Sequence, residues 1–204
     1  MISFILQKCY VRPALLQIIL SMAICSNCLA QSGKGKLVYK TSKSQEVAVY
    51  KGSIFVGKEM RYTLREDVVL YDSKKTKLIE NSGSSFLFLE IDDSPNKNKF
   101  YIFKISNGKV DSIGMSISSD IRDVDGDGNL EFGGCDWTEV HPSKDSMYYI
   151  PSDYFELKNG KIIYDSSLTK KIDIQVNGLY LPNPADANGN CCRVIPKPAK
   201  KKRN

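Results

Sequence analysis

Phe86-Leu-Phe-Leu-Glu-Ile91 and Phe100-Tyr-Ile-Phe-Lys-Ile105 are short runs of aromatic and β-branched residues that lie between polar breaks. Runs of this kind are typical of β-strands. Further runs predict strands at residues 46–50, 53–56, 60–64, 68–71, 147–150, 154–157 and 161–164. Because no segment carries a helical period over three turns, the sequence predicts a mostly β protein that is built as an antiparallel meander.

Two Asn-Gly pairs, Asn107-Gly108 and Asn159-Gly160, lie between predicted strands. Adjacent residues with positive φ close two-residue hairpins, and Asn-Gly is a favoured pair for this turn. The segments around these pairs, residues 103–110 and 155–162, match each other at an offset of 52 residues. We therefore expect both pairs to form hairpins of the same type.

A fainter match relates residues 123–128 to residues 173–178 at an offset of 50. A period of this length is that of a β-propeller blade or a related repeat. The sequence thus predicts blade-like repeats around residues 84–134 and 145–182. The alternative is that Asn-Gly hairpins recur by chance.

Asp123-Val-Asp-Gly-Asp-Gly-Asn-Leu-Glu131 places four carboxylates at alternate positions around two glycines. Ca²⁺ takes six to eight oxygen ligands, and a loop that binds it offers oxygens at its positions 1, 3, 5, 7 and 9. The predicted ligands at these positions are Asp123, Asp125, Asp127, Asn129 and Glu131. Position 12, where an EF-hand has a bidentate glutamate, is Gly134, so the sequence predicts a calcium loop of another kind.

A solvated acidic turn is the alternative for this loop, because Asp-Gly is common in hairpin connections. Four acids within nine residues repel one another without a counter-ion, which favours calcium. We expect the ion to fix the loop rather than to take part in a reaction.

Residues 123–132 resemble the calcium loop of integrin-type (FG-GAP or VCBS) β-propeller repeats, which joins two strands and has an acid at its ninth position. The resemblance implies a β fold with a calcium loop between strands. The chain is also similar, in architecture and export, to periplasmic inhibitors of invertebrate-type lysozyme and the related immunity proteins. This weaker similarity implies an inhibitor-like binding role.

Residues 1–30 have the features of a signal peptide, with Lys8 and Arg12 before an apolar run and small residues at the end. The apolar run has about a dozen residues, fewer than the ~20 that span a bilayer. We therefore expect a periplasmic or secreted protein without a transmembrane segment in the mature chain, and a lipid-modified Cys25 or Cys28 is the lesser alternative. Residues 31–182 are predicted to form a single β domain, and residues 183–204 a flexible basic tail.

The formal charge of +6 comes from the ends of the chain. Seven of the 29 basic residues lie in residues 1–30 and 196–204, which leaves 22 basic residues against 23 acidic ones. Because a nucleic-acid groove needs basic residues gathered on one face, nucleic acid is excluded as the expected partner. Of the three cysteines after the leader, Cys135 is expected to form a disulfide with Cys191 or Cys192 under oxidising conditions.

Sequence motifs for an enzyme are weak. His141 is the single histidine and precedes a proline, and a Gly-x-Ser-x-Gly nucleophile signature is absent. We therefore name no catalytic residue. The sequence favours an exported, calcium-binding β domain that binds a protein or glycan of the cell envelope, with a calcium-dependent hydrolase of envelope polysaccharide and a purely structural surface domain as alternatives.

Overall fold

The computed structural model describes residues 36–68, 70, 73–136 and 142–198, so the predicted signal peptide lies outside the described residues. The described chain is mostly β, and the pairs between its strands are antiparallel, as the sequence predicted. The first sheet contains β1 (Lys36–Lys40), β2 (Glu46–Tyr50), β3 (Ser53–Val56) and β4 (Glu59–Thr63) in this order. The second contains β5 (Lys77–Asn81), β6 (Ser84–Ile91), β7 (Lys99–Ser106) and β8 (Lys109–Ile117), also in chain order.

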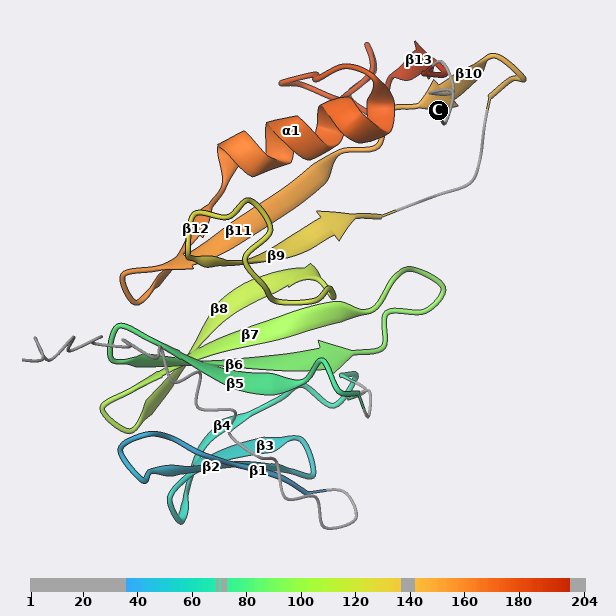
Figure 1. Cartoon of the computed structure of the whole chain (residues 1–204). Coiled ribbons are helices and arrows are strands. Elements are labelled where there is room, and N and C mark those ends of the chain that lie inside the picture. Colours follow the sequence, from blue (N-terminus) through green and yellow to red (C-terminus); the bar gives the residue numbers. More distant parts are fainter. Residues whose placement is uncertain (1–35, 69, 71–72, 137–141, 199–204) are drawn as a thin grey trace, which may run out of the picture.

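The third sheet has the order β12 (Lys161–Tyr164), β11 (Ser152–Lys158), β9 (Leu130–Cys135). One helix, α1 (Ser166–Asn177), lies against this sheet, and β10 (Ser146–Tyr148) pairs with β13 (Val194–Pro196) beside the end of the helix. The three larger sheets follow one another in space in the order of the chain (Figure 1). The second sheet therefore has a neighbouring sheet on each of its faces.

Strand β6 shows why the sheets stack in this way. Its side chains alternate between two cores: Phe86 and Phe88 face the third sheet, and Leu87 and Leu89 face the first. All four are fully buried. Burying one such side chain contributes roughly 1.5–3 kcal/mol, so a strand that is apolar on both faces requires a covering layer on each.

The predicted strands are confirmed, except at residues 68–71, of which 69 and 71 lie outside the described residues and Leu70 forms an isolated bridge with Ile91. Both Asn-Gly pairs close hairpins, with φ of 50° and 75° at residues 107 and 108 and of 51° and 70° at residues 159 and 160.

The second sheet is a four-stranded meander, as a propeller blade would be. The third sheet is different, and the described residues form neither a closed propeller nor a closed barrel.

The sequence did not predict the one helix of the described residues, α1, which occupies residues 166–177. Asp165 caps its N-terminus by accepting a hydrogen bond from the Leu168 N–H, and Gly178 ends it with φ of 78°. The faint repeat at residues 173–178 therefore lies in a helix and not in a loop like residues 123–128. The buried face of α1 is largely polar, with Thr169, Asp173 and Asn177 beside Leu168. The sequence of the helix therefore has no apolar residues at helical spacing by which it could be recognised.

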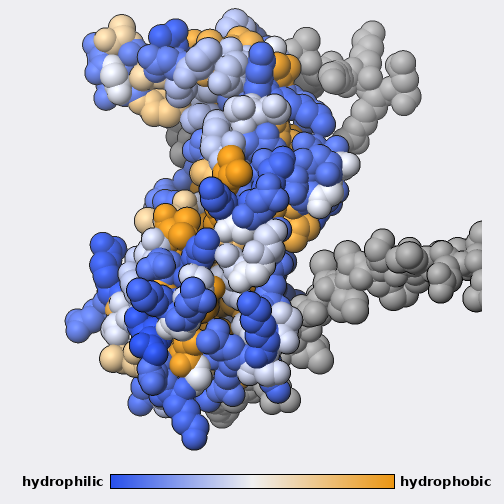
Figure 2. Space-filling view, turned by 90° about the vertical axis from the view of Figure 1, so that its left-hand side faces the viewer, coloured by the Kyte–Doolittle hydropathy of each residue, from blue (hydrophilic) through white to orange (hydrophobic). Residues whose placement is uncertain are grey.

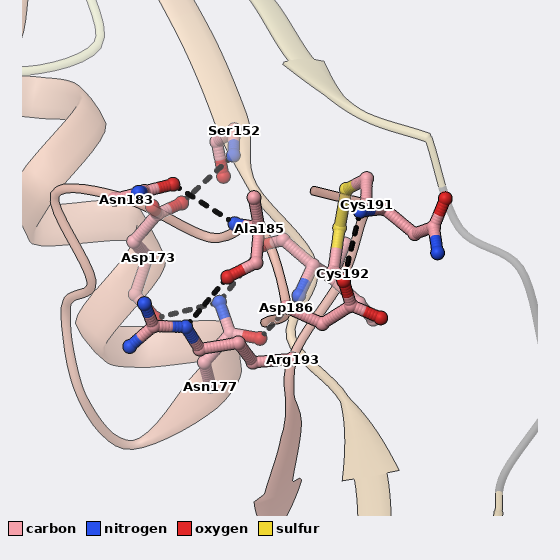
Figure 3. Close-up of a disulfide and its surroundings, with 11 residues drawn as sticks. Ser152, Asp173, Asn177, Asn183, Ala185, Asp186, Cys191, Cys192 and Arg193 are labelled. Atoms are coloured by element: carbon pink, nitrogen blue, oxygen red, sulfur yellow. Dashed lines mark hydrogen bonds between the residues drawn. A yellow bond between two sulfur atoms is a disulfide. The ribbon is translucent and has the colours of Figure 1, made fainter. Parts of the chain in front are cut away.

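These polar side chains bind the backbone of β11 and of the residues before it. Thr169 accepts a hydrogen bond from the Tyr154 N–H at 3.1 Å, and Asp173 accepts one from the Ser152 N–H at 2.9 Å (Figure 3). Asn177 bonds both the N–H and the carbonyl of Ile150 at 2.8 Å. Four residues of helix rise about 6 Å and two residues of strand about 6.6 Å, so each side chain meets every second residue of the strand. Side chains of α1 thus form hydrogen bonds with the edge of β11 and the residues before it, in the part of the chain that β12 does not reach.

Residues 183–196, which were expected to belong to a flexible tail, include β13. Its Ile195 is buried opposite Met147 of β10. The preceding turn is closed by the Arg193 side chain, which donates to the Ala185 carbonyl at 2.6 Å (Figure 3). The apolar side chain of Ile195 gives this segment a place in a small third core with Tyr149 and Ile150.

One side of the molecule is mainly hydrophilic, with its hydrophobic residues in separate small patches (Figure 2). Within the part of the chain that the structure describes, no helix has the length and apolar character that crossing a membrane requires.

The contact between α1 and β11 can be tested by Asp173→Ala. Asp173 also accepts a 2.5 Å hydrogen bond from the Tyr149 hydroxyl. Burial, and after it this hydrogen bond, raises the pKa of Tyr149. The substitution leaves the Tyr149 hydroxyl and the Ser152 N–H buried without an acceptor, so we expect a loss of about 3 kcal/mol in the free energy of unfolding, measured by urea denaturation. The exposed neighbour Ile174 provides the control, and Ile174→Ala should change stability by no more than about 0.5 kcal/mol. Equal losses in both variants would contradict the assignment.

Candidate metal centre

The acidic loop connects β8 of the second sheet with β9 of the third. At its base Arg122 and Glu131 exchange two backbone hydrogen bonds, of 3.1 and 2.8 Å. The loop then curls around Asp123, whose carboxylate accepts from the N–H groups of Gly126 at 2.6 Å and Gly128 at 3.0 Å. Gly126 and Gly128 have φ of 86° and 90°, which favour glycine. The local sequence thus fixes a tight turn that brings its acids close together.

Four of the five predicted ligands come together. One carboxylate oxygen from each of Asp123, Asp125, Asp127 and Glu131 lies within 4.8 Å of the other three. The three aspartates are exposed, whereas Glu131 is buried with an exposed fraction of 1%. This cluster could hold a metal ion.

Glu131 is the unusual member of the cluster. Its Oε2 accepts a 2.6 Å hydrogen bond from the Val124 N–H. Its Oε1 is fully buried and has no hydrogen-bond partner among the described residues. Burial raises the pKa of Glu131, the Val124 hydrogen bond lowers it, and the charges of Asp125, Asp123 and Asp127 raise it further. A buried, unpartnered carboxylate oxygen costs free energy, and a cation among the four acids would remove that cost.

Asn129, the fifth predicted ligand, was expected to offer its backbone carbonyl, and this remains a prediction. Its side chain donates to Asp127 at 2.8 Å and to Glu156 of β11 at 3.1 Å. Hydrogen bonds from the backbone N–H and side chain of Asn129 lower the pKa of Asp127. Asn129 therefore links the loop to the third sheet.

Glu156 and Lys158 of β11 also belong to this site, and the sequence analysis did not identify them. Glu156 lies directly opposite Glu131 in the pairing of β11 with β9, and Lys158 lies 3.2 Å from Glu156 and 3.7 Å from Asp127. Hydrogen bonding to Glu156 raises the pKa of Lys158. The signal for these residues is the cross-strand register, which the local sequence does not contain.

Comparisons with models of protein families, with curated proteins and with solved structures found no match. The fold and the loop geometry therefore carry the functional argument.

The cysteines pair differently from the prediction. The disulfide joins the neighbours Cys191 and Cys192 (Figure 3). Cys135 is buried at the end of β9. The expected bond between Cys135 and this pair is therefore not formed. His141, which the sequence did not favour as a general base, lies outside the described residues.

Glu131→Gln tests the cost of the buried carboxylate. Glutamine keeps an oxygen for the Val124 N–H but removes the charge that three aspartates repel. In a chelating buffer we therefore expect this variant to be more stable than the parent protein by about 1 kcal/mol, measured as a rise in melting temperature. Glu59→Gln is the control, because Glu59 is exposed on β4 and far from the loop in sequence. A clear drop in the melting temperature of Glu131→Gln alone would contradict this account.

Proposed function

We propose that this chain is an exported β domain that binds Ca²⁺ through the loop at residues 123–131 and recognises a protein or glycan partner in the cell envelope. The observation that carries the proposal is the buried carboxylate of Glu131, which belongs to a cluster with three aspartates and whose Oε1 lacks a hydrogen-bond partner among the described residues. The signal-like residues 1–30 support export.

The chemistry of the donor set favours calcium. All four side chains offer carboxylate oxygen, which suits a hard cation, and neither histidine nor cysteine belongs to the cluster. Ca²⁺ also tolerates irregular geometry and completes its shell with backbone carbonyls and water. Asn129 can supply a carbonyl at the loop position where such sites use one. The resemblance to integrin-type calcium loops agrees with this choice.

The ion would have a structural role. The loop joins the second sheet to the third, and Asn129 and Lys158 connect it to β11. A bound Ca²⁺ would hold the base of the third sheet in one arrangement. A partner surface that is already ordered loses less conformational entropy on binding, so the ion would favour recognition.

Hydrolysis of a polysaccharide is the alternative that the described cavities support least. A glycoside hydrolase needs two carboxyl groups about 5–10 Å apart across the bond that it cleaves. In the cavity between the second and third sheets, Glu90 is the one carboxylate among the described lining residues. This favours binding over catalysis.

Calcium binding is tested by Asp125→Ala in thermal denaturation with millimolar Ca²⁺ and with EDTA. We expect Ca²⁺ to raise the melting temperature of the parent protein, because an ion that binds only the folded state stabilises it. Asp125→Ala should have a lower melting temperature in Ca²⁺ and should not respond to EDTA. Asp111→Ala, which removes an exposed aspartate of β8, should behave like the parent. Identical curves of the parent in both buffers would exclude a calcium role.

Partner binding is tested by immobilising the mature chain and passing envelope proteins and peptidoglycan fragments over it in both buffers. We expect a defined partner to be retained in Ca²⁺ and released by EDTA. The Asp125→Ala protein, run in parallel, should retain little of that partner. Retention of nothing by the folded, calcium-loaded parent would favour the purely structural alternative.

A further inference from the structure

A polar cavity of about 530 Å³ is lined by residues of the second and third sheets. The second sheet and its connections contribute Glu90 of β6, Asn98 and Ser118, and the third contributes Gly133 of β9 and Tyr154 of β11. Sites for small ligands are commonly concave and of this size. The cavity is outside the acidic loop and shares no residue with the metal cluster.

Glu90 is the feature that points to a ligand. It is buried with an exposed fraction of 3%, and it lies on the same face of β6 as Phe86 and Phe88. Its Oε1 accepts a 2.5 Å hydrogen bond from the Ser118 hydroxyl, and the ion pairs among the described residues do not include Glu90. A carboxylate can accept about four hydrogen bonds, so Glu90 retains acceptor capacity toward the cavity.

The charges around the cavity select against strongly charged ligands. Lys75 and Lys97 line it together with Glu90, and the Lys97 ammonium donates to the Cys135 carbonyl at 2.7 Å. A cation would meet the two lysines and an anion would meet the buried carboxylate. A neutral ligand whose hydroxyl groups both donate and accept hydrogen bonds avoids both conflicts. The ring of Tyr154 adds an apolar surface against which a sugar ring can pack.

The cavity is also connected to the proposed calcium loop. Ser119 precedes Asp123, the first residue of the loop, by four residues, and Gly133 follows Glu131, the last one, by two. The Ser119 hydroxyl accepts a 2.9 Å hydrogen bond from the Gly133 N–H, which joins the two ends of the loop at the cavity wall. An ion that orders residues 123–131 would therefore also order this wall.

We propose that this cavity binds a neutral saccharide of one or two rings, that Glu90 accepts hydrogen bonds from its hydroxyl groups, and that Ca²⁺ in the neighbouring loop strengthens the binding. The proposal rests on the proposed function in that it takes the glycan, of the two partner classes, as the ligand. Glu90 and its surroundings add a specific binding site to that function.

The test uses the mature full chain and three neutral disaccharides: cellobiose, maltose and diacetylchitobiose. Dissociation constants are measured by NMR titration in Ca²⁺ and in EDTA. We expect at least one disaccharide to bind the calcium-loaded parent with a dissociation constant below about 10 mM. Glu90→Gln should weaken that binding about tenfold, the usual effect of losing hydrogen bonds to a charged group. EDTA should weaken it about fivefold, in the range of ordinary coupling between two sites.

Two controls separate binding from folding. Glu59→Gln makes the same change on an exposed strand and should leave the sugar affinity unchanged. Glu90→Gln should melt at the same temperature as the parent or above it. The substitution removes a buried charge whose desolvation destabilises the folded protein when no ligand is bound. Asn98→Ala, at the partly buried rim, serves as a second variant and should also weaken binding.

The outcomes distinguish this inference from the calcium proposal. Binding of no disaccharide below about 10 mM, or equal affinity of the parent and both cavity variants, overturns the saccharide site. If Ca²⁺ still raises the melting temperature in that case, the proposal that the loop binds calcium is retained without the saccharide site. If sugar binding depends on Glu90 but is unchanged by EDTA, the saccharide site is supported and its coupling to the calcium loop is contradicted. Binding of triglycine in place of the sugars also overturns the inference.

Discussion

The double-sided burial of β6 is the constraint on which the rest of this structure depends. Phe86 and Phe88 need one covering layer and Leu87 and Leu89 need another, so the second sheet is stable only between the first and the third. The chain meets this requirement with local connections, because each of the first two sheets is formed by consecutive strands. The third sheet lacks a fourth strand, and α1 completes it with side chains that bond the backbone of β11.

This stacking also creates the two places where chemistry can occur. The chain must cross from β8 to β9 at the edge of the core, and the crossing is the acidic loop. Because β9 is packed as a core strand, Glu131 is buried at the start of it, next to three aspartates that solvent can reach. The cavity with Glu90 lies between the same two sheets. Loop and cavity therefore respond to the same arrangement of the second and third sheets.

The sequence predicted those features that depend on neighbouring residues. Alternating aromatic and branched runs identified most strands, the Asn-Gly pairs identified two hairpins, and the spacing of the acids identified four side chains that do come together. It did not predict α1, because Thr169, Asp173 and Asn177 bury polar groups whose partners are distant strand amides. Glu156, Lys158 and Glu90 were missed for the same reason: strand register and sheet stacking, and not local spacing, bring them to their sites.

Three buried carboxylates in this chain show how surroundings assign different roles to one chemical group. Asp173 accepts hydrogen bonds from the Tyr149 hydroxyl and the Ser152 N–H at its two oxygens, so both are satisfied within the protein and its role is structural. Glu131 has one oxygen that accepts a hydrogen bond and one without a partner among the described residues, and its carboxylate lies in a cluster of four acids that a cation would complete. Glu90 is bonded by Ser118 and borders a polar cavity, where donors from a ligand can reach it. Because burying a carboxylate costs several kcal/mol unless its charge is compensated, the latter two positions are best explained by binding rather than by stability.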